Sequence, residues 1–186
     1  MYPVQFNVTE QQTTFRRAHV FLRILILVLI SMIASPLGLL YLGLPVVAAV
    51  FVAQKGGERY VQETGPKVAA ALRVLMGVTA YIGILTDRLP GSGEEPVRLE
   101  IERSGSPTVG SCLLRILYAI PSAVALTLVA FVGLVVWVAA AVLVLVRESY
   151  PQSFRTFLTG LARWQARLFV YLASLIEPYP PFRLGV

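Results

Sequence analysis

Two long stretches of this chain contain no aspartate, glutamate, lysine or arginine. The first runs from Ile24 to Ala53 and the second from Ile116 to Val146, which makes 30 and 31 residues. A helix that crosses the hydrocarbon core of a bilayer needs about 20 apolar residues, and two crossings with a turn need roughly 40. The chain is 56% hydrophobic with a mean hydropathy of +0.73, which is too apolar for a soluble domain of its size. The sequence therefore predicts an integral membrane protein.

The length of each run favours a tight helical hairpin over a single crossing. Arg23 stands directly before the first run and Arg115 directly before the second. If these arginines extend their side chains to the lipid headgroups, each run gains about a turn of helix, which is enough for a short hairpin. The first run offers a turn at Ser35–Gly38, whereas the second offers only Pro121 and Gly133. We expect hairpins over about residues 19–53 and 112–146.

The distribution of cations decides the predicted topology. If each run crossed once, each side of the membrane would carry seven cations, the two boundary arginines aside, and no orientation would be favoured. With two hairpins, both termini and the central segment share one face, and the turns on the other face carry no charge. We therefore predict a multi-pass protein of the inner (cytoplasmic) membrane, with its N- and C-termini in the cytoplasm.

The pattern of the first half of the chain recurs in the second half. The alternating segment Pro96–Ile101 repeats Pro3–Val8 at an offset of 93, and Arg115 repeats Arg23 at an offset of 92. We interpret the chain as two tandem membrane repeats, residues 1–93 and 94–186, that point the same way in the bilayer. Further matched pairs, each 90 residues apart, are Arg73 and Arg163, Tyr81 and Tyr171, Leu85 and Leu175, Asp87 and Glu177, and Pro90 and Pro180.

The third element of each repeat is a predicted helix, over about residues 66–86 and 153–176. In the second copy, apolar residues recur at helical spacing, while Arg155, Arg163 and Arg167 share another face. Three arginines at mid-bilayer depth would be costly, so we expect an amphipathic helix at the membrane interface. The first copy is more apolar. If both copies crossed the membrane instead, each repeat would have three crossings and the repeats would be inverted.

Together these elements predict an all-α integral membrane protein with two tandem repeats, each made of a short strand, a hydrophobic helical hairpin and an interfacial amphipathic helix. Each half resembles a unit of the bacterial membrane family catalogued as domain of unknown function 4389. The second half carries its motifs most plainly, as Tyr150-Pro151, Arg163-Trp164 and Tyr179–Phe182. The first half departs from them, with Val61 in place of proline and Val74 in place of tryptophan. The resemblance implies an architecture and no activity.

The sequence contains no residue cluster that is typical of catalysis or metal binding. Cys112 is the single cysteine and His19 the single histidine, so neither has a partner at ligand spacing. No Ser-His-acid set and no glycine-rich phosphate loop can be identified. The net charge of +6 lies in the segments that flank the apolar runs, where attraction to anionic headgroups explains it. We expect no enzyme activity, no cofactor and no nucleic-acid partner.

Charged residues near the predicted membrane boundary are the candidate site residues. Asp87 and Glu177 stand at the ends of the third helices, and their matched positions suggest that each pairs with Arg23 or Arg115. A solvated carboxylate at a helix end is the alternative. We expect contacts with lipid headgroups or anions from six arginines, Arg23, Arg73, Arg115, Arg155, Arg163 and Arg167.

Two functions fit this sequence. The first is a non-catalytic membrane protein, either an accessory or scaffold subunit of a membrane complex or a hairpin protein that shapes the bilayer. Its partners would be anionic lipid headgroups and a protein in the membrane. The alternative is a small lipid or anion carrier, in which the repeat-related Arg73 and Arg163 face a shared cavity. Arginines that point into such a cavity would favour the carrier, and arginines that point to headgroups would favour the structural role.

Overall fold

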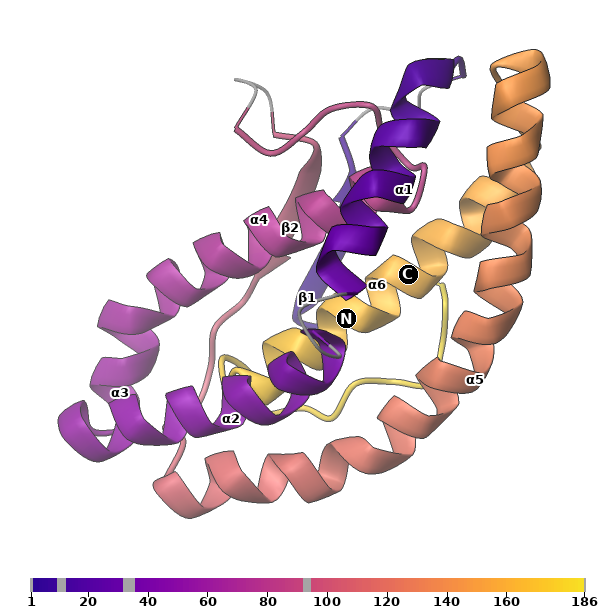
Figure 1. Cartoon of the computed structure of the whole chain (residues 1–186). Coiled ribbons are helices and arrows are strands. Elements are labelled where there is room, and N and C mark those ends of the chain that lie inside the picture. Colours follow the sequence, from indigo (N-terminus) through magenta and orange to yellow (C-terminus); the bar gives the residue numbers. More distant parts are fainter. Residues whose placement is uncertain (1, 10–12, 32–35, 92–94, 186) are drawn as a thin grey trace.

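The computed structural model describes residues 2–9, 13–31, 36–91 and 95–185. Most of these residues are helical, and one small sheet joins the two halves of the chain (Figure 1). In chain order the elements are β1 (Val4–Val8), α1 (Arg17–Ser31), α2 (Pro36–Lys55), α3 (Gly57–Arg59), the π-helical turn η1 (Tyr60–Thr64), α4 (Gly65–Ile82), β2 (Val97–Ile101), α5 (Val109–Arg147) and α6 (Gln152–Leu172).

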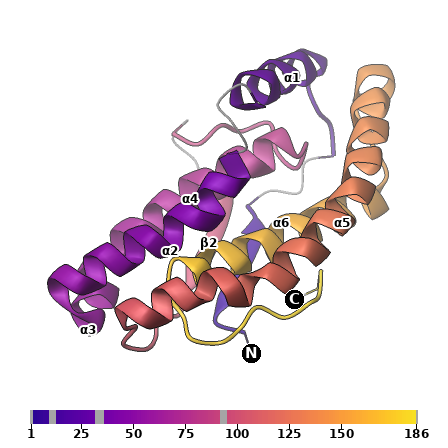
Figure 2. The same cartoon turned by 60° about the horizontal axis from the view of Figure 1, so that its bottom comes forward.

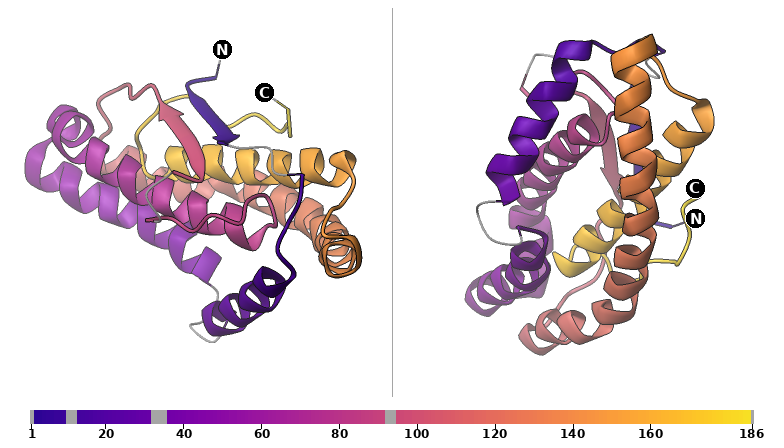
Figure 3. Two further views of the ribbon diagram at one scale, coloured as in Figure 1. Left: turned by 90° about the horizontal axis from the view of Figure 1, so that it is seen from above. Right: turned by 45° about the vertical axis from the view of Figure 1, so that its right-hand side comes forward.

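The elements form three layers. The sheet lies on α4 and α6, and both termini are on this side of the molecule (Figure 3, left). On the other side of α4 and α6 lie α1, α2 and α5, which form a layer that faces the viewer in Figure 1. The middle layer is thus covered by the sheet on one side and by apolar helices on the other.

α6 is the central helix of the fold. It packs against α5, α4, α2 and β1, and Leu168, Phe169 and Leu172 at its centre are fully buried. Protein packs against the arginine face of α6 as well as against its apolar face, and the predicted place of this helix at the membrane interface stays a prediction. Arg155 and Arg167 are buried on α6 along with the apolar residues. Their guanidinium groups find partners within the protein.

The prediction of a second hairpin, over about residues 112–146, is wrong. A single 39-residue helix, α5, runs through the whole segment and contains Pro121 in its interior. The helix bends, so its first part runs beside α6 and its last part turns away (Figure 2). The run lacks a Pro-Gly turn signal in its middle, and a proline in a helix removes only one hydrogen bond and bends the axis. The apolar residues around Pro121 therefore continue the helix.

The first predicted hairpin, over about residues 19–53, corresponds to two separate helices, α1 and α2. Of the expected turn at Ser35–Gly38, Ser35 lies outside the described residues, whereas the other three residues are the first of α2, which Pro36 opens. α1 packs against α4 and α5, whereas α2 packs against α5 and α6. Together, α1 and α2 occupy the positions in the first half that the single helix α5 occupies in the second.

The all-α prediction omits a two-stranded antiparallel sheet, which the two short predicted strands form with each other. Phe6 lies opposite Leu99, and Val8 lies opposite Val97. Phe6 and Leu99 are 93 residues apart, so they are equivalent positions of the predicted repeats. The register is therefore symmetric about this pair, as it would be across a twofold axis.

Two backbone hydrogen bonds beyond the strands continue this symmetry. The amide of Thr9 donates to the carbonyl of Pro96 at 3.1 Å, and the amide of Glu102 donates to that of Pro3 at 2.9 Å. Each bond becomes the other when 93 is added to the residue numbers of the first half. The third helices show the same symmetry, because each packs on the strand of the other half: α6 packs on β1 and α4 packs on β2.

Tyr60 in η1 ties the two halves together. Its side chain is buried, and its hydroxyl donates to the carbonyl of Ala173 at 2.6 Å. Burial raises the pKa of Tyr60 from 10.0 to about 12. Between these values the unfolded chain loses the phenolic proton while the folded chain keeps it, so the stabilisation by Tyr60 is present below pH 10 and lost as the pH rises toward 12.

Replacement of Tyr60 by phenylalanine is expected to lower the free energy of unfolding at pH 9 by about 1 kcal/mol, because the buried carbonyl of Ala173 loses its partner. At pH 11 the difference in the free energy of unfolding between the two proteins should be smaller. Ionisation of the Tyr60 side chain stabilises the unfolded state only of the protein that keeps this tyrosine. Thermal unfolding in detergent at both pH values measures the effect. The other buried tyrosines titrate in both proteins and cancel, and an unchanged difference would contradict the prediction.

Candidate functional site

Arg23 closes the carboxyl end of α4. Its Nε donates to the carbonyl of Tyr81 at 2.7 Å, and its Nη2 donates to the carbonyl of Thr86 at 3.0 Å and to Oδ1 of Asp87 at 2.6 Å. The guanidinium carbon lies 4.8 Å from the centroid of the Tyr81 ring, and the side chain is fully buried. The last carbonyl groups of a helix lack intrahelical partners and carry partial negative charge, so a cation is stabilised there.

Arg115 binds the carboxyl end of α6 in the way that Arg23 binds the end of α4. Its Nη1 donates to the carbonyls of Tyr171 at 2.7 Å and Ile176 at 2.6 Å, and its guanidinium carbon lies 4.5 Å from the centroid of the Tyr171 ring. Tyr171 and Ile176 stand 90 residues after Tyr81 and Thr86. The two arginines therefore make equivalent contacts in the two halves, with a backbone carbonyl before and after the helix end and a tyrosine ring beneath.

The helix ends that receive these arginines also have the same backbone. Ile84 and Ser174, again 90 residues apart, both lie in the left-handed region, with φ of 58° and 56°. The next amide bonds back to the last turn, from Leu85 to the carbonyl of Ala80 and from Leu175 to that of Val170. Glycine usually occupies such a position, and an isoleucine there is strained. The arginine contacts on either side of Ile84 help to hold this conformation.

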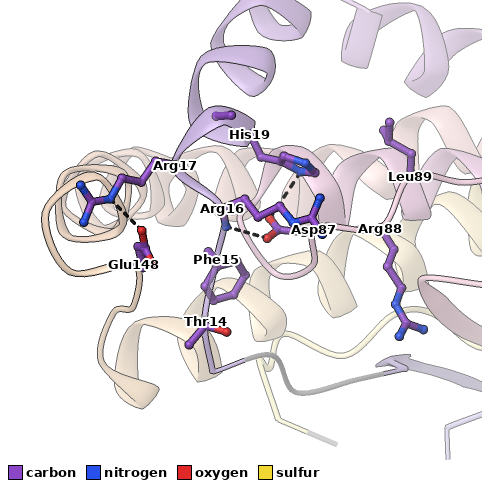
Figure 4. A pocket seen from close by; sticks show the side chains of 10 residues that line it. Thr14, Phe15, Arg16, Arg17, His19, Asp87, Arg88, Leu89 and Glu148 are labelled. Carbon is purple, nitrogen blue, oxygen red and sulfur yellow. Dashed lines mark hydrogen bonds and ion pairs between the residues drawn. The ribbon is translucent and has the colours of Figure 1, made fainter.

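Asp87 is the centre of a charged cluster between α1 and the end of α4. Besides Arg23, it accepts a hydrogen bond from the amide of Arg16 at 2.9 Å, and Nδ1 of His19 lies 3.6 Å from its Oδ1 (Figure 4). Arg17 on the same helix pairs with Glu148 at 3.0 Å, beyond the end of α5. Asp87 thereby fixes the start of α1 onto α4.

These residues surround a pocket of about 800 Å³ at one end of the molecule. The pocket carries charges of both signs, because two acidic side chains and three arginines line it together with His19. Within the described residues, no group of three histidine, cysteine or acidic side chains is arranged to hold a metal ion. The lining residues are Thr14, Phe15, Arg16, Arg17, Ala18, His19, Asp87, Arg88, Leu89 and Glu148 (Figure 4).

Glu177 does not repeat the ion pair of Asp87. Of the described residues, none forms an ion pair with Glu177, and Arg115 gives its short contacts to carbonyl groups. The Glu177 side chain instead lies against Gly105, whose φ of 90° only glycine adopts freely. Of the two carboxylates, the structure thus places Asp87 against a boundary arginine and leaves Glu177 beside a loop.

The three arginines of α6 have protein partners. Arg155 lies between aromatic rings, 5.5 Å from the centroids of both Phe15 and Tyr150. Arg163 donates to the carbonyls of Phe6 and Leu184, each at 3.2 Å.

Arg167 donates to the carbonyl of Gly185 at 2.9 Å, and burial lowers its pKa. An arginine keeps its charge despite such a shift, because its normal pKa is far above neutral. The basic face of α6 therefore binds β1 and the C-terminal tail. Its contact with lipid headgroups stays a prediction.

Arg73 and Arg163 lie in different surroundings. Arg73 on α4 pairs with Glu95 at 3.3 Å, and both side chains are exposed, by 40% and 63%. Arg163 contacts β1 and the tail. Neither of these arginines lines the pocket described above. Among the described residues the two arginines therefore have different partners, and the carrier stays a prediction.

Two parts of this site, the tyrosine rings and His19, were not predicted from the sequence. Tyr81 and Tyr171 were identified only as matched positions, and their equal spacing from Asp87 and Glu177 is the signal that could have placed them beside the arginines. His19 stands four residues before Arg23, so both side chains lie on one face of α1. That spacing could have indicated a shared partner.

Residues 110–183 match a family described as a domain of unknown function (DUF4389). The match covers α5, α6 and most of the C-terminal tail, and it supports the family that the sequence motifs indicated. One copy is matched, so the first half of the chain lies outside it. No curated protein and no solved structure matches the chain.

Proposed function

We propose that this chain is a non-catalytic integral membrane protein, which embeds the layer of α1, α2 and α5 in the bilayer and serves as a scaffold or bilayer-shaping element. The observation that carries the proposal is the outer surface of this layer. It exposes large apolar side chains along all three helices, including Phe21 on α1, Leu42 on α2, and Phe131 and Val135 on α5, which are 57% to 69% exposed. Soluble monomers rarely expose contiguous apolar surfaces of this extent.

The composition of two helices supports the same proposal. The segment Gly38–Lys55 of α2 and the whole of α5 are long and apolar enough to cross a membrane. Only 22% of the apolar stretch in each of these helices is buried within the protein, whereas the core helix of a soluble protein is mostly buried. By contrast, α6 is buried and exposes no large apolar side chain. Most of the exposed large apolar side chains therefore belong to one layer, whereas Val74 of α4 and Phe182 of the tail lie outside it.

Basic residues at the rim of this layer suit anionic lipid headgroups. Arg16 and Arg17 lie at the start of α1, Arg147 ends α5 and Lys55 ends α2. Cations beside a membrane segment are attracted to anionic lipids and favour the cytoplasmic side. We accordingly place the protein in the cytoplasmic membrane, with this rim and both termini on the cytoplasmic side, where a partner protein would also bind.

We also propose that the two halves are tandem copies of one unit. The symmetric strand register, the paired arginine contacts at Arg23 and Arg115, and the two left-handed residues at equivalent helix ends support this. Each feature relates residues 90 to 93 positions apart, although only the second half matches the family. Tandem copies would arrange the scaffold around an approximate twofold axis.

The charge-free surface of α5 provides the test of membrane insertion. Replacement of Leu128 and Val135 by aspartate, at positions 63% and 69% exposed, is expected to release the protein from the membrane fraction. Each charge placed in the hydrocarbon costs about 2.5–3.5 kcal/mol. Extraction of membranes with alkaline carbonate, followed by quantification of pellet and supernatant, measures this.

A matched control places two aspartates at Ser153 and Thr156, which are exposed at the start of α6. This variant should stay in the pellet as the natural protein does, because acidic residues in a first helical turn are tolerated and the surface is polar. Release of the natural protein by carbonate without detergent would overturn the proposed function. So would full retention of the variant with aspartates on α5.

A further inference from the structure

We infer that the layer of α1, α2 and α5 lies parallel to the membrane plane and inserts into one leaflet only. The acyl chains of that leaflet then contact its exposed apolar side chains. The inference rests on the proposed membrane function and adds its orientation. It replaces the predicted crossings with a shallow insertion, and it places both ends of every described helix on the same side of the bilayer.

α5 is much longer than a helix that crosses a bilayer needs to be. At about 1.5 Å per residue its 39 residues extend along roughly 58 Å, nearly twice the hydrocarbon thickness of about 30 Å. Exposed apolar side chains occur along the whole helix, from Leu117 through Val135 to Val146. A perpendicular α5 would leave about half of them in water or headgroups. A helix that lies in the plane keeps all of them in contact with lipid.

The opposite face of the molecule is charged at its middle. Arg98 and Glu100 on β2 point away from α4, and both are exposed, as is Asn7 on β1. The sheet lies behind the centre of the helix layer (Figure 1). In a perpendicular orientation these charges and the free edges of the two strands would stand at mid-bilayer depth, where unpaired charges and unpaired backbone groups are costly. In the parallel orientation they face water.

The path of the chain between α4 and α5 gives an independent argument. Asp87 just beyond α4 binds the amide of Arg16 at one end of the molecule, and Pro107 just before α5 lies against Gly57 at the other end. The described residues between them, 88–91 and 95–106, form turns, irregular backbone and the strand β2, and none of them is helical. If α5 crossed the bilayer, this segment would have to cross it as well. Non-helical backbone is not stable in contact with lipid, so this path of the chain favours the parallel orientation.

The thickness of the layer fits one leaflet. A helix with its side chains is about 10 Å across, and half of the hydrocarbon core is about 15 Å. The middle layer of α4 and α6 would then lie at the headgroup level, and the sheet would lie above it in water (Figure 3, left). An element of this shape expands one leaflet and not the other, which is how inserted helices shape a bilayer.

Single cysteines in a Cys112→Ala background test the orientation in intact cells and in inverted membrane vesicles. Ser106→Cys before α5 and Gln152→Cys after it are at exposed positions. We expect a membrane-impermeant maleimide to label both in inverted vesicles and neither in intact cells. Glu100→Cys on the sheet should behave in the same way. A fluorophore on Leu128→Cys should be quenched by brominated acyl chains.

Labelling of Ser106→Cys and Gln152→Cys from opposite sides would overturn the inference, because α5 would then cross the bilayer. Protection of Glu100→Cys on both sides would overturn it as well, since the sheet would not face water. The proposed function fails in a different way, by release of the natural protein in alkaline carbonate. Carbonate-resistant protein with labels on opposite sides would thus refute the orientation alone.

Discussion

Replacement of Arg23 by methionine is expected to destabilise the protein by about 3–5 kcal/mol, because the carboxylate of Asp87 stays in a largely buried site and loses its short ion pair with Arg23. The change also removes the donors to the carbonyls of Tyr81 and Thr86 at the end of α4. The loss would lower the unfolding temperature in detergent and the yield of folded protein. Thermal unfolding followed by circular dichroism measures it.

Arg17 on the same helix provides the matched control. It forms an ion pair with Glu148 at 3.0 Å, but both side chains are more than half exposed. Exposed pairs contribute about 0–1 kcal/mol, so Arg17→Met should have little effect. The double variant Arg23→Met with Asp87→Asn should regain part of the stability, since the asparagine carries no charge and still accepts from the amide of Arg16. Equal effects of Arg23→Met and Arg17→Met would contradict the assignment.

The ends of the third helices show what local sequence patterns can and cannot predict. The predicted ranges, 66–86 and 153–176, cover α4 and α6, and their starts agree with the structure to within a residue. Both helices end four residues earlier than expected, before Ile84 and Ser174. The usual signal for a left-handed residue is glycine or asparagine. Here the arginine contacts and the surrounding protein impose the conformation, and these depend on the tertiary structure.

The second apolar run shows the same limit. Its composition predicts a membrane-embedded helix, and the structure has a helix there, but length and charge alone could not decide between one long helix and a hairpin. A hairpin needs a turn that leaves its backbone groups satisfied, and α5 has only Pro121 in its first half. The first run, which carries Pro36 and Gly38, is divided into α1 and α2.

The arginines of α6 illustrate why the candidate site could be identified only in part. The periodicity of Arg155, Arg163 and Arg167 correctly places them on one helical surface, because it depends only on spacing. Arg163 and Arg167 are covered by a strand about 160 residues earlier in the chain and by a tail that the pattern does not locate, and Arg155 is covered by Phe15 and Tyr150. Membrane phosphates and protein carbonyls both accept hydrogen bonds from guanidinium groups, so the sequence alone could not distinguish them.

Each half pairs its strand with the strand of the other half, and we call this the exchange of strands. It predicts that neither half folds alone. Residues 1–93 lack the partner strand for β1, and residues 94–186 lack the one for β2. Each third helix loses the strand on which it packs, and the hydrogen bonds between the halves are lost, including those from Tyr60 to Ala173 and from Trp137 to Ile82. Separately expressed halves should therefore be degraded or aggregate. Co-expressed halves should assemble, because a cut near residue 93 leaves every one of these contacts available.

Purification through a tag on one half measures this directly, since the untagged half should be retained with it after detergent extraction. A second cut, inside α6 after Ala162, is the matched control, because it divides the central helix and no separate unit regains its packing; those fragments should not assemble. Monomeric, folded residues 94–186 would contradict the exchange of strands. A self-associated second half would instead agree with it, since the register about Phe6 and Leu99 allows the strand of one copy to take the place of β1 beside another.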